Sequence, residues 1–481
     1  MKNLFFDTKI LDSRATQDFL LPSEILMENA ARGMAEFICS QFDKHSKILL
    51  VCGSGDNGAD CLALARMLAG KYSLGIFLPL GIKSSLCQLQ YERLKKVSLC
   101  CEIEFLSTLD NSTLAQFNLI IDGIFGIGFK GQLADELKSL IALLNQSCAT
   151  KIACDIPSGI DKSGNPCILD DRTFAFKADF TLTMGALKTA LFSDLAKDFV
   201  GEIHCIELGI SQQIFSTDSS FMLLESQDFK APKRKLKNCN KGSFGHLSIF
   251  GGEKSGASIL AALSGFKIGA GLVSIISQTP PPNLPYEIMH SCFIPSNTTA
   301  ILLGMGFGKE TPLPLESLQN FKEIPLLLDA DIFYHKDFQN LTQNFKNLIL
   351  TPHPKEFQTI LKTLCHQEIS TQEIQKNRIS LALEFSQKYP NITLILKGAN
   401  SIIAKNGEIF INPLGSNALA KGGSGDVLAG MIGGFLAQSY SPLESCIQGT
   451  LAHSLCARNF CKKNADFSLS PLDLITQIRY L

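Results

Sequence analysis

Three loops in the first third of the chain carry residue types suited to binding anions or cations and to moving protons. They cover residues 53–60 (Gly-Ser-Gly-Asp-Asn-Gly-Ala-Asp), 122–132 and 155–161, and each follows a short apolar run. Glycines at a strand-to-helix turn let backbone N–H groups approach a phosphate, and the start of the helix adds a favourable dipole. A single loop of this kind can equally be a plain tight turn.

Taken together, the loops predict a cation or substrate site. Ligands bind at the carboxyl ends of parallel strands, so Asn57, Asp122, Asp155 and Ser158 are expected at one edge of a sheet. Amide, carboxylate and turn oxygens suit a hard monovalent or divalent cation. The alternative is that each Asp only caps the helix that follows it.

A second glycine turn, residues 422–430 (Gly-Gly-Ser-Gly-Asp-Val-Leu-Ala-Gly), precedes an apolar helical pattern. The N–H groups of such a helix start can hold a transferring phosphoryl group. Asp426 beside it could take a hydroxyl proton during that transfer. The alternative is that Asp426 only stabilises the first helical turn.

Further polar loops follow other apolar runs of the second half. His353 stands between two prolines in one of them, where it is either a structural side chain or a catalytic one. The segments are 241–246, 304–308, 328–331, 351–357 and 397–401.

Short apolar runs that alternate with longer helical patterns predict an α/β protein with mostly parallel sheets. A helix is expected after Ala59, ending near Gly70. The predicted strands are 48–52, 74–78, 119–122 and 152–155 in the first half, and 247–250, 272–276, 300–303, 326–329, 348–350 and 393–396 in the second.

The composition excludes several classes of protein. Lys and Arg total 44 against 45 for Asp and Glu, so the chain lacks the net positive charge that nucleic-acid-binding proteins usually have. No apolar stretch reaches about 18 residues, and the N-terminus has no apolar core of signal-peptide length. Sixteen scattered cysteines without a C-x-x-C pair indicate reduced thiols in a cytoplasm rather than a zinc or dithiol site.

The length of 481 residues predicts more than one domain. We expect an N-terminal domain over residues 1–212, a polar linker over 213–235 and a second domain over 236–481. The basic run 231–235 is interpreted as part of the solvated linker.

The N-terminal loops resemble the epimerase domain of bacterial bifunctional NAD(P)H-hydrate repair enzymes, through G-x-G-x-N-G-x-D, D-x-x-F-G-x-G and D-I-P-S-G. The resemblance implies a Rossmann-like αβα sandwich, a potassium site at Asn57, Asp122 and Ser158, and Asp155 as the catalytic acid or base. It also implies a set of residues that bind the hydrated dinucleotide: Asp56, Asn57, Gly58, Ala59, Asp60, Gly126, Ile127, Gly128, Phe129, Lys130, Gly131, Gln132 and Asp155. Cys61 stands where the family usually has glycine, so the sequence does not determine the backbone dihedral angles of this loop.

The second half resembles the ADP/ATP-dependent NAD(P)H-hydrate dehydratase domain, which has a ribokinase-like fold. The resemblance implies catalytic Asp426, and binding of the hydrate by Ala257, Gly306, His353 and Asp426. The residues implied to bind ADP or AMP are Lys397, Gly398, Ala399, Asn400, Ser401 and Gly425. Asn240 replaces a usual histidine and Lys355 a usual glycine, and Lys355 could alter the loop around His353.

We therefore expect a fused enzyme that interconverts the (R) and (S) hydrates of NADH and NADPH and dehydrates the (S) form with ADP, yielding the reduced cofactor, AMP and phosphate. Potassium, ADP or ATP, and Mg²⁺ are the expected cofactors. The expected partners are small molecules and further copies of the chain, with no nucleic acid or membrane. The alternatives are a ribokinase-superfamily vitamin-precursor kinase with an accessory domain, and a ligand-binding or scaffolding N-terminal module.

Overall fold

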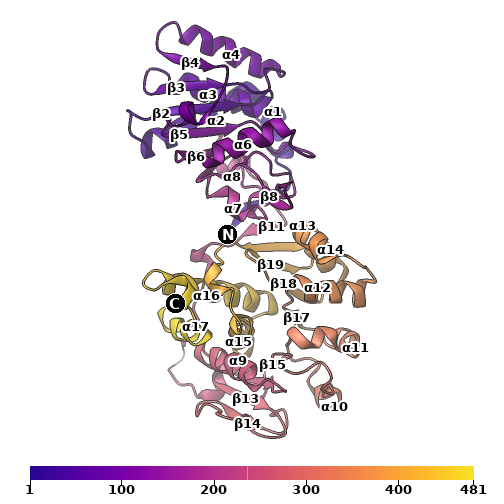
Figure 1. The fold of residues 1–481 in the computed structure, drawn as a ribbon. Helices are drawn as coiled ribbons and strands as arrows, with labels where there is room; N and C mark the ends of the chain where they lie inside the picture. The colour runs from indigo at the N-terminus through magenta and orange to yellow at the C-terminus, as the bar shows by residue number, and fades with distance from the viewer. Residues whose placement is uncertain (236) are drawn as a thin grey trace. The chain divides into compact units, whose positions relative to one another are not determined.

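The computed structural model describes residues 1–235 and 237–481, which fold as two compact units. One unit is Asn3–Ser219, and the other is Ser220–Leu481 together with Met1–Lys2. In Figure 1 the first runs from indigo to magenta and the second from pink to yellow.

The boundary between the units differs from the linker expected over 213–235. Helix α8 (Gln212–Phe215) still belongs to the first unit, and Phe215 is buried there. Strand β11 (Phe221–Leu223) pairs in parallel with β20 (Glu408–Asn412), because its apolar side chains continue the sheet of the second unit. Most of α8 and all of β11 thus lie within the range expected for the linker.

The first two residues also depart from the expected domain 1–212. The amino group of Met1 lies 2.6 Å from Asp228 Oδ1, and Lys2 Nζ lies 2.8 Å from Glu225 Oε1. These ion pairs attach Met1 and Lys2 to the second unit.

The N-terminal unit is built on a parallel sheet with the order β10-β9-β6-β5-β2-β3-β4. Side chains of β2 alternate: Ile48 and Leu50 pack under α2, α3 and α4, whereas Leu49 and Val51 pack on the face that α6 covers. The strands are β2 (Lys47–Cys52), β3 (Ser73–Phe77), β4 (Ile103–Leu106), β5 (Leu119–Gly123), β6 (Thr150–Cys154), β9 (Phe180–Met184) and β10 (Glu202–Ile206).

The helices of this unit lie on both faces of the sheet, which gives the expected αβα sandwich (Figure 1). A two-stranded hairpin, β7 (Cys167–Leu169) and β8 (Arg172–Phe174), stands apart from the main sheet. The helices are α1 (Lys9–Gln17), α2 (Ser23–Gln41), α3 (Asp56–Leu68), α4 (Ser85–Val97), α5 (Asn111–Leu114), α6 (Asp135–Gln146), α7 (Lys197–Val200) and α8.

The C-terminal unit has a larger sheet, in which the order runs β11-β20-β19-β18-β17-β16-β15-β12-β13-β14. Neighbours are parallel except around β19, which is antiparallel to both β18 and β20. The remaining strands are β12 (His246–Phe250), β13 (Leu272–Ile276), β14 (Met289–Ser291), β15 (Ala300–Leu303), β16 (Leu326–Leu328), β17 (Leu348–Leu350), β18 (Ile392–Leu396) and β19 (Ser401–Lys405).

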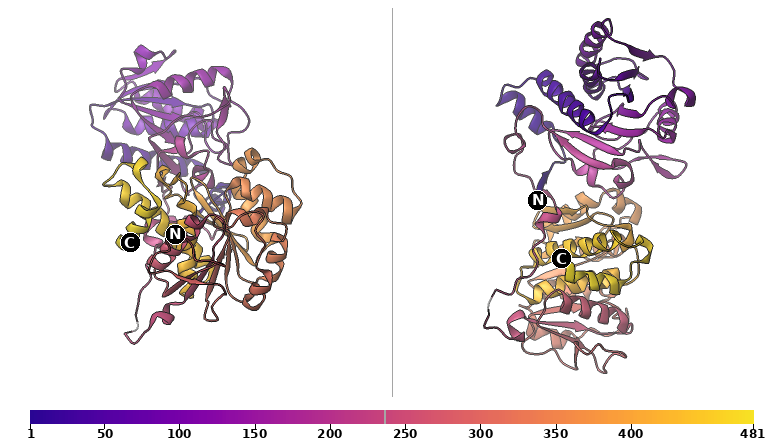
Figure 2. Two further views of the ribbon diagram at one scale, coloured as in Figure 1. Left: turned by 60° about the horizontal axis from the view of Figure 1, so that its bottom comes forward. Right: turned by 90° about the vertical axis from the view of Figure 1, so that its left-hand side faces the viewer.

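Helices α9, α15 and α16 pack together against this sheet (Figure 2). A Cβ added at Gly430 of α15 would lie 2.1 Å from Ala261 O of α9, so only glycine permits this approach. The helices are α9 (Ser255–Lys267), α10 (Leu315–Leu318), α11 (Phe338–Asn344), α12 (Pro354–Ile360), α13 (Thr371–Lys376), α14 (Arg378–Lys388), α15 (Ser424–Ala437), α16 (Pro442–Cys461) and α17 (Pro471–Gln477).

The predicted α/β class is confirmed for both units. Each strand expected from the sequence is present; the ends shift by at most one residue, except that β6 begins at Thr150, two residues before the expected start. Across residues 1–235 and 237–481, none of the helices combines the length and the apolar character needed to cross a bilayer.

Candidate active sites

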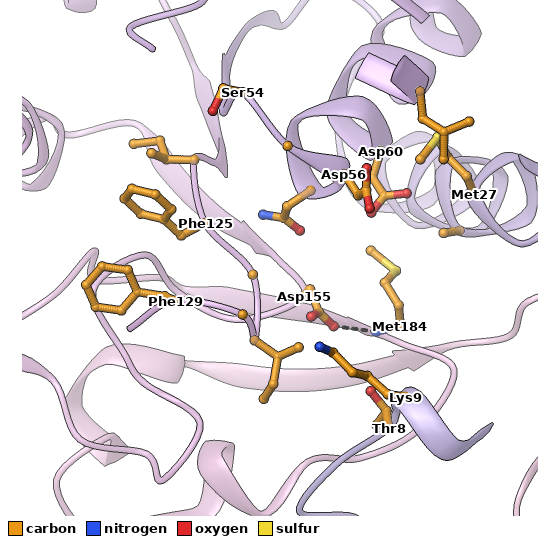
Figure 3. A pocket seen from close by; sticks show the side chains of 18 of the residues that line it. Thr8, Lys9, Met27, Ser54, Asp56, Asp60, Phe125, Phe129, Asp155 and Met184 are labelled. Atoms are coloured by element: carbon orange, nitrogen blue, oxygen red, sulfur yellow. Dashed lines mark hydrogen bonds between the residues drawn. The ribbon is translucent and has the colours of Figure 1, made fainter. Parts of the chain in front are cut away.

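The loops at the carboxyl ends of β2, β5 and β6 surround a cavity of about 890 Å³ in the N-terminal unit (Figure 3). Helices α1 and α2 supply Asp12 and Met27 to its wall. Among the residues predicted to bind the hydrate, Gly58, Ala59 and Gly131 do not line this cavity. Those that do are Asp56, Asn57, Asp60, Gly126, Ile127, Gly128, Phe129, Lys130, Gln132 and Asp155.

Two glycines of the first loop are needed for close packing of the backbone. A Cβ at Gly53 would lie 2.0 Å from Ile124 O, and one at Gly58 would lie 1.9 Å from Gly53 O. Helix α3 begins at Asp56, so Cys61 has a helical backbone that accepts any L residue. The cysteine in place of glycine therefore leaves the dihedral angles of the loop unchanged.

Asp155 directly follows β6 in the left-handed region, with φ of 71°. Such a backbone is uncommon outside glycine and asparagine and persists where the surroundings hold it. Its Oδ1 accepts from Lys188 Nζ at 2.6 Å, Met184 N at 3.1 Å and Thr183 Oγ1 at 3.2 Å. Within the described chain no hydrogen bond reaches Oδ2, which leaves that oxygen for a ligand.

Two further carboxyl groups of this cavity have perturbed pKa values. Burial, aided by the negative charges of Asp155 and Asp56, raises the pKa of Asp60 well above the usual value. Burial also raises the pKa of Asp12 on α1. Burial therefore favours the neutral form of both Asp60 and Asp12.

Asp122 and Ser158 lie in contact beneath the cavity, next to Asn57. The Asp122 carboxylate accepts from Ser158 N and Ser158 Oγ, each at 2.7 Å, and burial raises its pKa to about 6. Asn57 Nδ2 is buried without a hydrogen-bond partner, and its Oδ1 would lie 3.3 Å from a Cβ at Gly126. The unpartnered Nδ2 is a hydrogen-bond donor and does not itself ligate a cation; the atoms that could hold one are Asn57 Oδ1 and the oxygens of Asp122 and Ser158.

The C-terminal unit brings Asp329, Lys397 and Asp426 together at the ends of β16 and β18 and at the start of α15. Lys397 Nζ lies 2.6 Å from Asp329 Oδ1 and 3.5 Å from where a Cβ at Gly425 would be. Burial, with the nearby charge of Asp329, raises the pKa of Asp426 to about 6. Gly423 precedes α15 with φ of 89°, a conformation that favours glycine.

His353 begins α12 beside the same cluster. Its Nδ1 accepts from Glu356 N at 3.2 Å, and its own N–H donates to Glu356 Oε2 at 2.8 Å. Burial raises the pKa of Glu356 to about 7, while burial and the Lys397 charge lower the pKa of His353. Lys355 lies in the first turn of α12 with an exposed side chain, so it does not disturb this cap.

The remaining residues predicted for the dehydratase lie in two parts of the C-terminal unit, Ala257 with Gly306 and the segment after β18. A Cβ at Gly306 would lie 3.0 Å from Ala257 Cβ, and a second cavity of about 510 Å³ adjoins them at Gly252 and Phe307. Gly398 and Ala399 are exposed after β18, Asn400 is buried, and Ser401 begins β19.

Comparisons with known proteins show the family of the chain. A family model described as NAD(P)H-hydrate dehydratase matches residues 247–479, and one described as YjeF-related protein N-terminus matches 23–190. The bifunctional NAD(P)H-hydrate repair enzyme of Helicobacter pylori is 42% identical over the whole length of both chains. The chain belongs to this family. The enzyme of Dictyoglomus turgidum is 32% identical over 98% of this chain and 96% of its own.

A solved structure is also similar. The Bacillus subtilis ADP/ATP-dependent NAD(P)H-hydrate dehydratase, co-crystallised with ATP and Mg²⁺, is 27% identical, with a TM-score of 0.43, over 52% of this chain and 92% of its own. The two family models and the full-length relatives confirm the bifunctional repair function and the lyase and isomerase classes expected from the sequence.

Sequence reasoning assigned no role to three buried side chains of this repair enzyme. Lys188 pairs with Asp155 from 33 positions away, and Arg378 Nη2 donates to Leu396 O and Lys397 O, which fixes the loop after β18. His453 of α16 lies 3.0 Å from Ser424 O at the start of α15, and burial lowers its pKa to about 4. An isolated Lys, Arg or His in a helical or loop segment carries no signal of such a contact.

We expect Lys188→Met to lower the free energy of unfolding of the N-terminal unit by about 3–5 kcal/mol. The Lys188 side chain is 2% exposed, so its removal leaves the Asp155 carboxylate buried without a counter-charge. Urea denaturation of the full chain, with this unit followed by hydrogen exchange, measures the change.

The matched control is Lys9→Met, which removes an exposed lysine from the same cavity and should change stability by less than about 0.5 kcal/mol. Adding Asp155→Asn to Lys188→Met should restore much of the loss. Equal stability of the Lys188→Met and Lys9→Met proteins would contradict the role given to the ion pair.

Proposed function

We propose that the two units repair hydrated NADH and NADPH in succession. The N-terminal unit interconverts the (R) and (S) epimers at Asp155, and the C-terminal unit uses ADP to dehydrate the (S) epimer at Asp426. One observation carries the proposal: each unit gathers its own predicted polar residues at one sheet edge, within a chain that matches repair enzymes from end to end.

The residues of the C-terminal unit suit a phosphoryl-transfer route to dehydration. Hydroxide is a poor leaving group and phosphate is a much better one. In the proposed step Asp426 takes the proton of the hydroxyl as its oxygen attacks the terminal phosphorus of ADP, which releases AMP. The N–H groups at the start of α15 and the Lys397 ammonium stabilise the charge on the transferring group. Phosphate then leaves with the C–O electrons, and loss of a neighbouring ring proton regenerates the reduced nicotinamide.

Magnesium fits this step as a companion of the nucleotide. Among residues 1–235 and 237–481, no group of three His, Cys, Asp or Glu side chains is arranged to hold a metal ion. Mg²⁺ commonly binds through one or two carboxylates and the substrate phosphates, so Asp329 and Asp331 are the carboxylates we assign to it. Lys397 to Ser401 and Gly425 would hold ADP or ATP.

Potassium is the cation we assign to Asn57, Asp122 and Ser158. Their amide, carboxylate, hydroxyl and carbonyl oxygens are hard ligands, and none of the three is a sulfur or imidazole group. The bound ion would add positive charge next to the cavity wall and favour binding of a phosphate-bearing substrate.

The free thiols of all sixteen cysteines support a reducing, cytoplasmic location.

We expect the two activities to separate by single substitutions. Asp426→Asn should slow ADP-dependent dehydration about a hundredfold to ten-thousandfold, through loss of the base, and leave epimer exchange near normal. Asp155→Asn should do the reverse, so that the (S) epimer is still repaired while the (R) epimer accumulates.

Both rates are measured on the full chain with separated epimers, in assays short enough to limit spontaneous exchange. Loss of both activities in a folded Asp426→Asn protein would refute the assignment of one reaction to each unit.

Replacement of potassium by a bulky organic cation should slow epimerisation and leave dehydration by the C-terminal unit less affected. The reason is that a large cation cannot fit between the buried Asp122 and Ser158 side chains. Rates of epimer exchange in matched potassium and tetramethylammonium salts test this. Unchanged rates at every concentration would remove potassium from the site.

We also propose that the chain forms a symmetric homo-oligomer. Large apolar side chains are exposed on both units, among them Ile10 at 70%, Leu20 at 81% and Phe293 at 79%. Light scattering at micromolar concentration should give a multiple of 52.4 kDa, whereas a monomeric mass would contradict the proposal.

A further inference from the structure

Epimerisation requires that a bond at the hydroxyl-bearing carbon breaks and re-forms. Water adds to an enamine at the carbon next to nitrogen, so the hydroxyl and the ring nitrogen share one carbon. Opening the ring between this carbon and the nitrogen gives an aldehyde that can turn and close on its other face. This route needs a base for the hydroxyl proton and an acid for the nitrogen.

We propose that Asp60 is the general acid of epimerisation and acts across the cavity from Asp155. The assignment rests on the proposed function of the N-terminal unit and gives that site a second catalytic residue. Asp155 has the free oxygen needed for the base, and Asp60 supplies the proton that the base cannot.

The step balances without any other reactant. Asp155 Oδ2 takes the hydroxyl proton, the O–H electrons form the carbonyl, and the C–N bond breaks with its electron pair going to nitrogen. Asp60 donates its proton to that nitrogen. After rotation of the aldehyde, each proton returns and the ring closes with the opposite configuration, so both groups end as they began.

The geometry puts the two carboxyl groups on different walls of one cavity. Asp60 projects from α3, and Asp155 projects from the turn after β6 (Figure 3). Every hydrogen bond to the Asp155 side chain ends on Oδ1, including that from Lys188. Asp60 has no hydrogen bond or ion pair with any described residue, so its proton is available to a ligand.

Asp60 is a better candidate for the general acid than the other carboxyl groups of the cavity. Asp12 and Asp56 also line the cavity, but both are exposed, whereas Asp60 is half-buried. The charged groups around Asp60 are mainly negative: Asp12 on α1, Asp56 on its own helix and Asp155 opposite, with Lys188 as the counter-charge of Asp155. Burial and these carboxylates raise the pKa of Asp60, which favours the protonated form that a general acid needs.

The test measures epimer exchange of the purified (S) hydrate by the full chain, without ADP, over a range of pH. Asp60→Asn should lower kcat about a hundredfold to ten-thousandfold with little change in KM. It should also abolish the fall in wild-type activity at high pH, because that fall reports deprotonation of the acid. Asp60→Glu should regain part of the rate.

Asp18→Asn is the matched control, since it removes an exposed carboxyl group of the same unit that does not line the cavity, and it should stay within about threefold of wild type. ADP-dependent dehydration by Asp60→Asn should remain normal, which shows that the C-terminal unit is folded, and unchanged hydrogen exchange over Asn3–Ser219 shows the same for the N-terminal unit. The proposal is overturned if Asp60→Asn exchanges epimers within threefold of wild type, or if Asp18→Asn loses as much. A wild-type protein without exchange would instead overturn the proposed function and this assignment with it.

Discussion

In each unit a carboxylate that follows a buried strand pairs with a lysine. In the N-terminal unit Lys188 lies 2.6 Å from Asp155, and in the C-terminal unit Lys397 lies 2.6 Å from Asp329. Removing one partner of such a pair lowers the free energy of unfolding by more than the intact pair raises it. The pairs therefore fix the positions of charged oxygens, and the remaining residues of each site are arranged around them.

The two ion pairs leave different carboxylate groups available to a ligand. Lys188 donates only to Oδ1 of Asp155. The Asp155 side chain is therefore fixed in position, while its Oδ2 can still bind a ligand. Lys397 instead pairs with Asp329 and lies near Gly425, which leaves Asp426 without a direct ion pair in the described chain. The first arrangement suits proton exchange at one carbon, and the second suits transfer of a phosphoryl group held at a helix start.

The strands and the glycine loops could be predicted because both depend on local patterns. Runs such as 119–122 and 348–350 are apolar enough to be buried strands, and the loops after them carry Gly and Asp at turn positions. The contacts of Lys188, Arg378 and His453 join segments far apart in the sequence, so no local pattern indicates them. Strand β11 was taken for linker because three apolar residues in a polar segment give too weak a signal.

Incubating the full chain with the pure (R) hydrate and ADP is the most direct test of repair by two successive sites. Only a chain with both sites can convert this epimer to the reduced cofactor. We predict that the absorbance of reduced nicotinamide recovers, with one phosphate and one AMP released for each cofactor regenerated. The rate should be limited by epimerisation and should exceed the spontaneous exchange measured without protein. A stable phosphorylated product, or recovery no faster than spontaneous exchange, would contradict the account.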